Sequence, residues 1–583
     1  MLFASLLLSA LPLFAQDHDV QASPFDGLRW SADAPEVLID GVWYRPVAID
    51  DIEVEAVLAL CQRRWPGRVQ KRFGEDLVEA LALLEWRGDL EVDLDLVRLD
   101  DGAEVRLEGV EMTRARRNAI RDSAGSSTPV PTRSTVSADR ARADVAAFGS
   151  GLRERFAYAA WRGIDLDAEL ARIEAELGDP VSTAELGRSL HRLLMRFGDG
   201  HADVSSPASG PAPGDGKLPF LLVESSAGVV AIEPDRSGLV DPKRPVVQAL
   251  DGRPLSEWLA AASPDVAAGS PQLVRRRSLR ALRELDALRR ELGEPTGGPV
   301  RVTFADAKGR RTTERELELT SRRPTYGTWP RAETGMLPGK LGYLRLPRMD
   351  DSVGALRRAM DELKDTRGLV VDVRGNGGGS RHLLLALAGY LIGPDEPAVV
   401  ANVARYRLHP EFGDRHLDAR FMYRADRSGW SEGARAAIEA CAASFEPEWD
   451  HPEGFSEWHY LVLERTGESG EYFYEQPVVV LSDAGCFSAT DIFLGGMTLL
   501  PRVTLLGTAS SGGSARSQTF RLPGTGMRVK CASMASFRPD GRLYDGRGIE
   551  VDEEVLPEPE DFLLGDSDAQ LEAAIKLLKR RSR

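Results

Sequence analysis

In the second half of the chain, short apolar runs alternate with stretches whose apolar residues recur at helical spacing. The clearest case begins with four aliphatic residues at 478–481, which are typical of a strand covered on both faces. Turn residues follow, and then Ala489, Ile492 and Phe493 recur at the spacing of a helix. The pattern predicts an α/β domain, with strands at 342–346, 369–373 and 478–481 and helices beginning near 353, 380 and 489.

The first part of the chain has a different pattern. Residues 24–121 combine a hairpin at 37–44, two helical stretches and an alternating strand pair at 91–111, which predicts an accessory α+β domain of unknown role. Residues 122–138 are rich in Ser, Thr and Pro and predict a flexible linker. Helical spacing then predicts a helical layer over 139–204, which has Ser182 as an N-cap and ends in the loop GDGH.

Residues 205–325 are predicted to be a small β-rich module with a helical insertion. An apolar strand near 245–250 is followed by the turn Asp251-Gly252 and a helix beginning near Leu255. The helix expected at 275–292 is strongly charged, and its arginine run is expected to be a solvated face.

The α/β pattern extends over 326–560. Inside it, residues 403–475 contain many aromatic residues, and we expect them to form an insertion that covers a site. Residues 561–583 predict a C-terminal helix. The chain of 583 residues is thus expected to be a multidomain α/β protein, because a single hydrophobic core stops growing near about 250–300 residues.

Composition narrows the function. The hydrophobic content of 42% and charged content of 28% are typical of a soluble globular protein. The net charge of −16 argues against a nucleic acid partner, since it repels phosphates. Residues 1–15 are similar to a signal peptide, although a basic n-region is missing, so we expect a secreted or periplasmic protein with no membrane span in the mature chain. An uncleaved anchor is the alternative.

The four cysteines, Cys61, Cys441, Cys486 and Cys531, have no metal-type spacing. An oxidising compartment would allow a Cys486–Cys531 bridge, which the sequence neither requires nor excludes. The histidines also lack the HExxH spacing of a zinc hydrolase. We therefore expect no metal and no cofactor. The sequence does not determine an oligomeric state.

A glycine-rich stretch follows one of the predicted strands. In GLVVDVRGNGGGS the strand ends near Asp372, Arg374 and Asn376, and three glycines follow. Backbone amides of such a loop can approach a ligand and bind a phosphate or an oxyanion. The stretch lacks the GK[ST] of a phosphate-binding loop, and Ser380 stands where a dinucleotide-binding motif needs its third glycine. A plain tight turn is the alternative.

Three further residues could carry chemistry. Ser488 lies at a strand-to-helix junction, where its hydroxyl would be exposed beside free helix amides, or where it would simply cap the helix. Of the 8 histidines, His201 stands out because a loop flanked by glycine presents it at a helix end. A nucleophilic serine needs such a base, and the base needs an acid. Asp545, in a glycine-rich turn, is a candidate for the acid.

Together these segments resemble peptidase family S41, which includes the C-terminal processing proteases, the tricorn-type proteases and the interphotoreceptor retinoid-binding protein. DVRGNGGG is similar to the family's D-x-R-x-N-x-G-G motif, and CFSATDIF to its nucleophile segment. GDGHADV resembles the D-G-H-T segment of the branch without a catalytic lysine, and DGRGIEVD resembles the closing motif. The resemblance covers roughly residues 139–560.

The resemblance implies a ClpP/crotonase-like catalytic domain and a serine endopeptidase that acts on peptides or proteins. It implies that Ser488 is the nucleophile, that His201 is the base and that Asp545 orients His201. The oxyanion would be bound by the amide of Ala489 with that of Gly377 or Gly378, and Asp372, Arg374, Asn376 and Asp199 would support the site. The module at 205–325 resembles a PDZ domain through PVVQALDGRPLSEW, and such modules bind a peptide as an added strand.

The chain also departs from the family's motifs. The catalytic lysine of the processing proteases aligns with Gly513, which argues against their Ser–Lys mechanism. Tricorn-type members carry a serine before the histidine, where this chain has Gly200, and a glutamate where it has Asp545. Asp199 could take over from Asp545. These changes leave a second hypothesis open, a catalytically inactive scaffold that binds a peptide or an apolar ligand, and a third in which Cys486 is the nucleophile.

Overall fold

The structure is a computed structural model. It describes residues 22–31, 34–64, 69–84, 86, 90–123, 134–205, 215–465 and 472–581. The expected signal peptide and most of the expected linker lie outside these residues. The chain forms two compact units, Met1–Pro131 and Thr132–Arg583. No helix among the described residues is both long enough and apolar enough to cross a bilayer.

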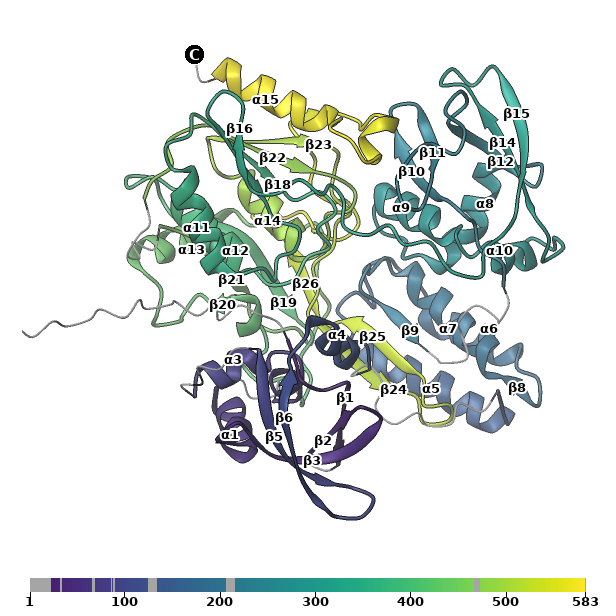
Figure 1. The fold of residues 1–583 in the computed structure, drawn as a ribbon, viewed down its shortest axis with the longest axis horizontal. Coiled ribbons are helices and arrows are strands. Elements are labelled where there is room, and N and C mark those ends of the chain that lie inside the picture. The colour runs from purple at the N-terminus through teal and green to yellow at the C-terminus, as the bar shows by residue number, and fades with distance from the viewer. Residues whose placement is uncertain are drawn as a thin grey trace, which may run out of the picture. The chain divides into compact units, whose positions relative to one another are not determined.

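The first unit is an antiparallel sheet with helices (Figure 1). Strands β2 and β3 form the hairpin expected at 37–44, and β5 and β6 are the strand pair expected at 91–111. The second of the two expected helical stretches consists of two short helices, α2 and α3, because the chain turns after Gly74. The elements are β1 (Gly27–Ser31), β2 (Ala34–Ile39), β3 (Val42–Ile49), β4 (Ile52–Glu53), α1 (Val54–Arg64), α2 (Val69–Gly74), α3 (Leu77–Ala82), β5 (Glu91–Arg98), β6 (Glu104–Glu111) and α4 (Arg114–Ser123).

The second unit begins with the expected helical layer. The Ser182 hydroxyl accepts a hydrogen bond from the Glu185 amide, so Ser182 is the predicted N-cap of α7. Strand β9, just after α7, pairs with β25 from near the end of the chain. This pairing brings the loop at the end of α7 to the C-terminal strands. The elements are β7 (Thr135–Val136), α5 (Ala138–Arg155), α6 (Leu166–Ala175), β8 (Val181–Ser182), α7 (Thr183–Arg196) and β9 (Asp203–Ser205).

The β-rich module follows as one antiparallel sheet in the order β10-β11-β12-β14-β15, packed on helices around the buried Trp258. The charged helix expected at 275–292 is divided into α9 and α10. The elements are β10 (Leu221–Ser225), β11 (Gly228–Ile232), β12 (Val246–Leu250), β13 (Arg253–Pro254), α8 (Leu255–Ala262), η1 (Ser263–Asp265), α9 (Pro271–Ala281), α10 (Leu285–Glu291), β14 (Val300–Ala305) and β15 (Thr312–Leu317).

The α/β pattern produces a sheet in the order β16-β17-β18-β22-β23-β27, which is parallel except at β16. Apolar residues of α15 cover one face, and α11, α12 and α14 pack on the other (Figure 1). The continuous apolar runs of the strands are explained by this burial on both faces. The elements are β16 (Gly335–Leu337), β17 (Leu341–Arg345), α11 (Val353–Leu363), β18 (Leu369–Asp372), α12 (His382–Leu391), β22 (Val478–Ser482), α14 (Ala489–Met497), β23 (Val503–Gly507), β27 (Glu553–Glu554) and α15 (Ala569–Arg581).

The segment expected as an insertion contributes to a second, antiparallel sheet in the order β20-β21-β19-β26. Its residue Arg420 reaches the glycine loop, where Nη1 lies 3.5 Å from the Gly379 carbonyl oxygen. The remaining elements of the chain are β19 (Val399–Tyr406), η2 (Asp418–Arg420), β20 (Tyr423–Arg424), α13 (Glu432–Ser444), β21 (His459–Leu463), β24 (Ser517–Arg521), β25 (Arg528–Ala532), β26 (Met534–Phe537) and η3 (Pro559–Phe562).

Candidate active site

Two neighbouring strands bring the candidate nucleophile and the glycine loop together. Strands β18 and β22 are parallel and in register, with Asp372 opposite Leu481, so their carboxyl ends lie at the same edge of the sheet. Ser488 follows β22 and precedes the first residue of α14, with φ 64° and ψ −119°. A positive φ is rare in a residue other than glycine and marks a backbone held by its surroundings. The Ser488 side chain is thereby presented at the helix N-terminus.

The glycine loop lies directly against Ser488. A Cβ on Gly378, which has φ +104°, would lie 2.7 Å from the Ser488 Cβ and from the Phe487 carbonyl oxygen. Asn376 joins the loop to α14, because its Oδ1 accepts hydrogen bonds from the Gly378 amide and the Thr490 hydroxyl. The Gly378 amide is thus already hydrogen-bonded, which disagrees with its expected use as an oxyanion donor.

Two other amides remain as candidates for that role. Ala489 is the first residue of α14, so its amide has no carbonyl partner within the helix. Within the described part of the chain, the Gly377 amide makes no hydrogen bond, and nothing lies within 4 Å of an added Cβ there. Gly377 and Ala489 are therefore the pair that could bind an oxyanion.

Asp372 and Arg374 anchor the start of the loop rather than contact Ser488. The Arg374 guanidinium donates to Asp372 and to Asp568, and both side chains of the Asp372–Arg374 pair are buried. Burial alone would raise the pKa of Asp372, but the Arg374 charge and its hydrogen bonds hold it below its ordinary value. Arg345 and Tyr343 also donate to Asp372. This network fixes the end of β18.

His201 stands between α7 and β9, and its Nε2 lies 2.9 Å from the Ser488 Oγ. The ring stacks on Phe487 with a centroid distance of 4.5 Å and an interplanar angle of 28°. Burial lowers the pKa of His201, the nearby Asp199 carboxylate opposes this, and the charges of Lys530 and Arg420 lower it further. A neutral imidazole in contact with a serine hydroxyl has the arrangement of a general base and its nucleophile.

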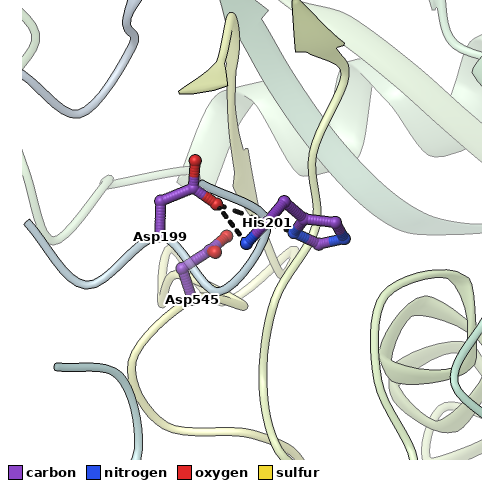
Figure 2. A group of neighbouring side chains, drawn as sticks. All are labelled: Asp199, His201 and Asp545. Atoms are coloured by element: carbon purple, nitrogen blue, oxygen red, sulfur yellow. Dashed lines mark hydrogen bonds and ion pairs between the residues drawn. The ribbon is translucent and has the colours of Figure 1, made fainter. Parts of the chain in front are cut away.

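Two buried carboxyl groups lie behind the imidazole (Figure 2). Asp199 Oδ1 accepts a hydrogen bond from the His201 backbone amide and lies 3.6 Å from His201 Nδ1. Asp199 Oδ2 accepts a hydrogen bond from the Ala532 amide. This second bond ties the carboxylate to β25. Asp199 is therefore the acid in direct electrostatic contact with the imidazole.

Asp545, the acid expected from the resemblance, makes no hydrogen bond with His201. Its Oδ2 accepts hydrogen bonds from the Tyr158 hydroxyl at 2.7 Å and the Ser514 amide at 3.1 Å. Burial and the nearby Asp199 charge raise the pKa of Asp545 well above its ordinary value, although these two donors oppose the shift. Asp199, His201 and Asp545 each offer one possible ligand atom, and these three atoms all lie within 4.8 Å of one another. This is the group that could hold a metal ion among the described residues.

Phe487 accounts for two departures from the family's motifs. A Cβ on Gly200 would lie 2.7 Å from the Phe487 Cζ, and one on Gly513 would lie 2.4 Å from its Cε2. The ring therefore occupies the space that a side chain at position 200 or 513 would need. Both glycines are needed because this chain places an aromatic ring there.

The arginine run of α9 is not the solvated face that we expected. The Arg277 guanidinium donates to the Gly200 carbonyl oxygen at 2.9 Å and lies 5.0 Å from the centroid of the Phe487 ring. Arg276 lies 3.6 Å from an Asp483 carboxylate oxygen. Burial lowers the pKa of Arg277, and the Asp199 charge opposes this. The helix packs against the loops that carry His201 and Ser488, where positive charge complements their acidic residues.

The cysteines take no part in this geometry. Cys486 is buried, its thiol donates to the Val373 carbonyl oxygen, and burial raises its pKa well above the ordinary value, which contradicts the thiol nucleophile. All four cysteines are free, so the Cys486–Cys531 bridge is not formed.

Near Ser488, Asp491 accepts hydrogen bonds from the Ser510 hydroxyl and the Gly512 amide, and burial raises its pKa to about 7.

Sequence patterns did not identify Phe487, Arg277 or Tyr158 as parts of the site. Phe487 could have been noticed, because it precedes Ser488 directly. Arg277 stands in a run of charged residues, and Tyr158 belongs to no recognisable motif. Neither residue therefore has a local sequence pattern that marks it as part of the site.

The sequence model of peptidase family S41 matches residues 340–555. Residues 340–555 form a peptidase family S41 domain. The S41 membership supports peptidase activity of the serine type. No curated protein matches the chain.

Solved structures agree with the S41 fold. A mutant of CPAF has a TM-score of 0.53 at 14% identity, and the match covers 76% of this chain and 96% of that chain. Mature CPAF complexed with lactacystin has a TM-score of 0.51 at 15% identity, covering 76% of this chain and 98% of that one. The photosystem II D1 C-terminal processing protease matches with a TM-score of 0.40 at 14% identity, covering 75% and 97%. The two CPAF structures show a shared fold.

Proposed function

We propose that the protein is a serine endopeptidase in which Ser488 is the nucleophile and His201 is the general base. The observation that carries this proposal is the distance of 2.9 Å between the Ser488 Oγ and the His201 Nε2, across residues 287 positions apart in the chain. A hydroxyl and an imidazole at this distance, beside the Ala489 amide at the start of α14 and a glycine loop, meet the geometric requirements for acyl transfer.

In the first step His201 Nε2 accepts the Ser488 proton while Oγ forms a bond with the peptide carbonyl carbon. The amides of Ala489 and Gly377 would donate to the oxyanion as charge develops on it. The C–N bond then breaks, and the imidazolium returns its proton to the leaving amine. Water attacks the acyl ester with His201 again as the base, which releases the acid and restores Ser488.

We assign Asp199 as the acid nearest the imidazole, with Asp545 behind it. Asp199 Oδ1 is 3.6 Å from His201 Nδ1 and is fixed by the His201 amide, whereas both donors to Asp545 bind its other oxygen, Oδ2. An ionised carboxylate at this place stabilises the imidazolium that forms when Ser488 loses its proton. The Ser-His-Asp mechanism would then use a residue of the histidine loop itself.

The module at 205–325 would present an extended peptide to the site, as the PDZ resemblance suggests. The edge strand β10 is occupied at one point, because the Tyr326 hydroxyl bonds both the amide and the carbonyl of Leu222. A peptide that adds to β10 would have to displace this hydroxyl. Export to the periplasm or the medium stays a prediction from residues 1–15.

The direct test is labelling with a fluorophosphonate, which reacts with an activated serine whatever the peptide specificity. The native chain should be labelled at one site, and Ser488→Ala should lose both labelling and cleavage of a peptide library, with an unchanged thermal unfolding temperature. Ser482→Ala is the matched control and should be labelled normally, because Ser482 is the last, buried residue of β22. Cleavage that persists in Ser488→Ala would exclude the proposal.

The second candidate function is an inactive scaffold that binds a peptide or an apolar ligand. The engaged Gly378 amide and the lack of a hydrogen bond between Asp545 and His201 favour it. The same experiment separates the two functions. A folded native chain that is not labelled by the fluorophosphonate, cleaves no peptide and co-purifies with a lipid would support the scaffold.

A further inference from the structure

Neither carboxyl group behind His201 forms an ion pair with an arginine or lysine in the described part of the chain, and the charges of Arg277 and Arg162 act on Asp199 and Asp545 only from a longer distance. Asp199 is 0% exposed and Asp545 is 1% exposed. Among the described residues, no arginine or lysine nitrogen lies within 4.0 Å of either group, and backbone amides and one hydroxyl are their hydrogen-bond donors. Two buried acids this close strongly disfavour a second negative charge unless a cation neutralises it. The space between them is therefore suited to a positive ligand.

Two atoms at this place have no hydrogen-bond partner in the described part of the chain. They are His201 Nδ1 and Asp545 Oδ1, and both are buried. Figure 2 shows the carboxyl groups of Asp199 and Asp545 turned toward each other beside His201. A buried polar atom without a partner costs about 1–3 kcal/mol. A single ion between the three side chains would satisfy both atoms.

The separations suit a small divalent cation. Zinc binds imidazole nitrogen and carboxylate oxygen at about 2.0–2.2 Å, so two of its tetrahedral ligands are about 3.4 Å apart. His201 Nδ1 and Asp199 Oδ1 are 3.6 Å apart, and all three ligand atoms lie within 4.8 Å of one another. A small rotation of Asp545 would close the remaining gap, because its Oδ2 carries both hydrogen bonds and its Oδ1 carries none.

An ion could reach this place without entering between Ser488 and the glycine loop. Asp545 lines a surface cavity together with Trp161, Arg162, Glu448, Gly546 and Arg547, and neither His201 nor Ser488 lines it. A water from this cavity could complete the four ligands of a zinc ion.

We propose that a zinc-class divalent cation binds between Asp199, His201 and Asp545 and inhibits the enzyme. A metal on Nδ1 requires that position to be unprotonated, so the proton of the neutral ring moves to Nε2. Nε2–H then donates to the Ser488 Oγ and cannot accept its proton. The ion would thus hold His201 in the tautomer that cannot act as the base for Ser488. The binding claim is independent of the proposed peptidase activity, and the inhibition claim rests on it.

Binding is tested on full-length Ser488→Ala, which keeps the three ligands. After removal of metals with a chelator, titration calorimetry with Zn²⁺ alone should give one tight equivalent, and Co²⁺ alone should give the visible absorption of a tetrahedral site. Adding Asp545→Asn should weaken Zn²⁺ binding roughly a hundredfold. Glu448→Gln is the control, since Glu448 lines the same cavity without being a ligand, and it should change the affinity little.

X-ray absorption of the zinc-loaded Ser488→Ala chain keeps the test independent of the Asp545 variant. It should show a nitrogen and oxygen shell that includes one imidazole. No Zn²⁺ binding, a sulfur ligand, or equal affinity in a folded Asp545→Asn variant would overturn the proposed site.

Inhibition is tested on the native chain by fluorophosphonate labelling with and without Zn²⁺. Labelling should slow at the Zn²⁺ concentrations at which Ser488→Ala binds it, and a chelator should restore the rate. A metal-free chain that is never labelled would refute the proposed peptidase activity but would not contradict the ion site. A labelled chain that binds Zn²⁺ with no loss of rate would refute the inhibition.

Discussion

Gly200→Ser tests whether the base depends on the packing of Phe487. The substitution restores the residue type that tricorn-type members carry before the histidine. Its Cβ would lie 2.7 Å and 2.9 Å from Phe487 Cζ and Cε2, whereas carbon atoms pack best at about 3.5–4.0 Å. The ring would have to retreat by roughly 0.8 Å at the least.

The ring has little room to retreat. Gly513 also lies close to the ring, since a Cβ there would lie 2.4 Å from Phe487 Cε2, and the Arg277 guanidinium lies 5.0 Å from the ring centroid. Because His201 stacks on Phe487 at 4.5 Å, the overpacking is expected to displace the imidazole from Ser488. Overpacking costs about 1–3 kcal/mol, and a misplacement near 1 Å lowers a rate about a hundredfold.

The assay is the second-order rate of fluorophosphonate labelling, measured beside the thermal unfolding temperature. Gly200→Ser should lower the rate about a hundredfold. Gly413→Ser is the matched control, since nothing lies within 4 Å of a Cβ there, and it should label normally. In a Phe487→Leu background, Gly200→Ser should cost far less than it does alone. A normal rate in Gly200→Ser, or an equal loss in both backgrounds, would refute the reasoning.

Two further predictions concern buried titratable groups. Asp199→Asn should slow labelling of Ser488 about a hundredfold, and Asp545→Asn should slow it less, because Asp199 lies 3.6 Å from His201 Nδ1. The reverse order would show that Asp545 is the acid that supports the imidazole. Burial lowers the pKa of His451 from 6.5 to about 4, and its ring lies among Trp449, Phe455 and other aromatic rings. As the pH falls through 6.5 the unfolded chain binds a proton that the folded chain refuses until about 4, so the native chain loses stability over this window. Denaturant unfolding should therefore show His451→Phe gaining about 2 kcal/mol relative to the native chain between about pH 8 and about pH 5, and a gain independent of pH would contradict the assignment.

Much of the scaffold could be predicted from local patterns. The apolar runs at β18 and β22, the turn residues after them and the helical spacing after Ser488 each reflect a preference of a short segment. The structure confirms these elements, and the parallel register of β18 and β22 explains why Ser488 and the glycine loop lie together. The proximity of two strand ends follows from the order of the strands in the sheet, so it can be predicted without knowing the positions of single atoms.

The detailed geometry around His201 was decided by tertiary packing. No local pattern indicates that Arg277 from another module donates to the Gly200 carbonyl, or that Phe487 fills the space beside Gly200 and Gly513. The choice between Asp199 and Asp545 also depends on side chains distant in the sequence, such as Tyr158. The sequence alone determined the elements and the residue types for acyl transfer, because hydrophobic periodicity and turn chemistry act locally. Which groups contact the imidazole is determined by long-range packing at distances of a few ångströms, which only the folded chain defines.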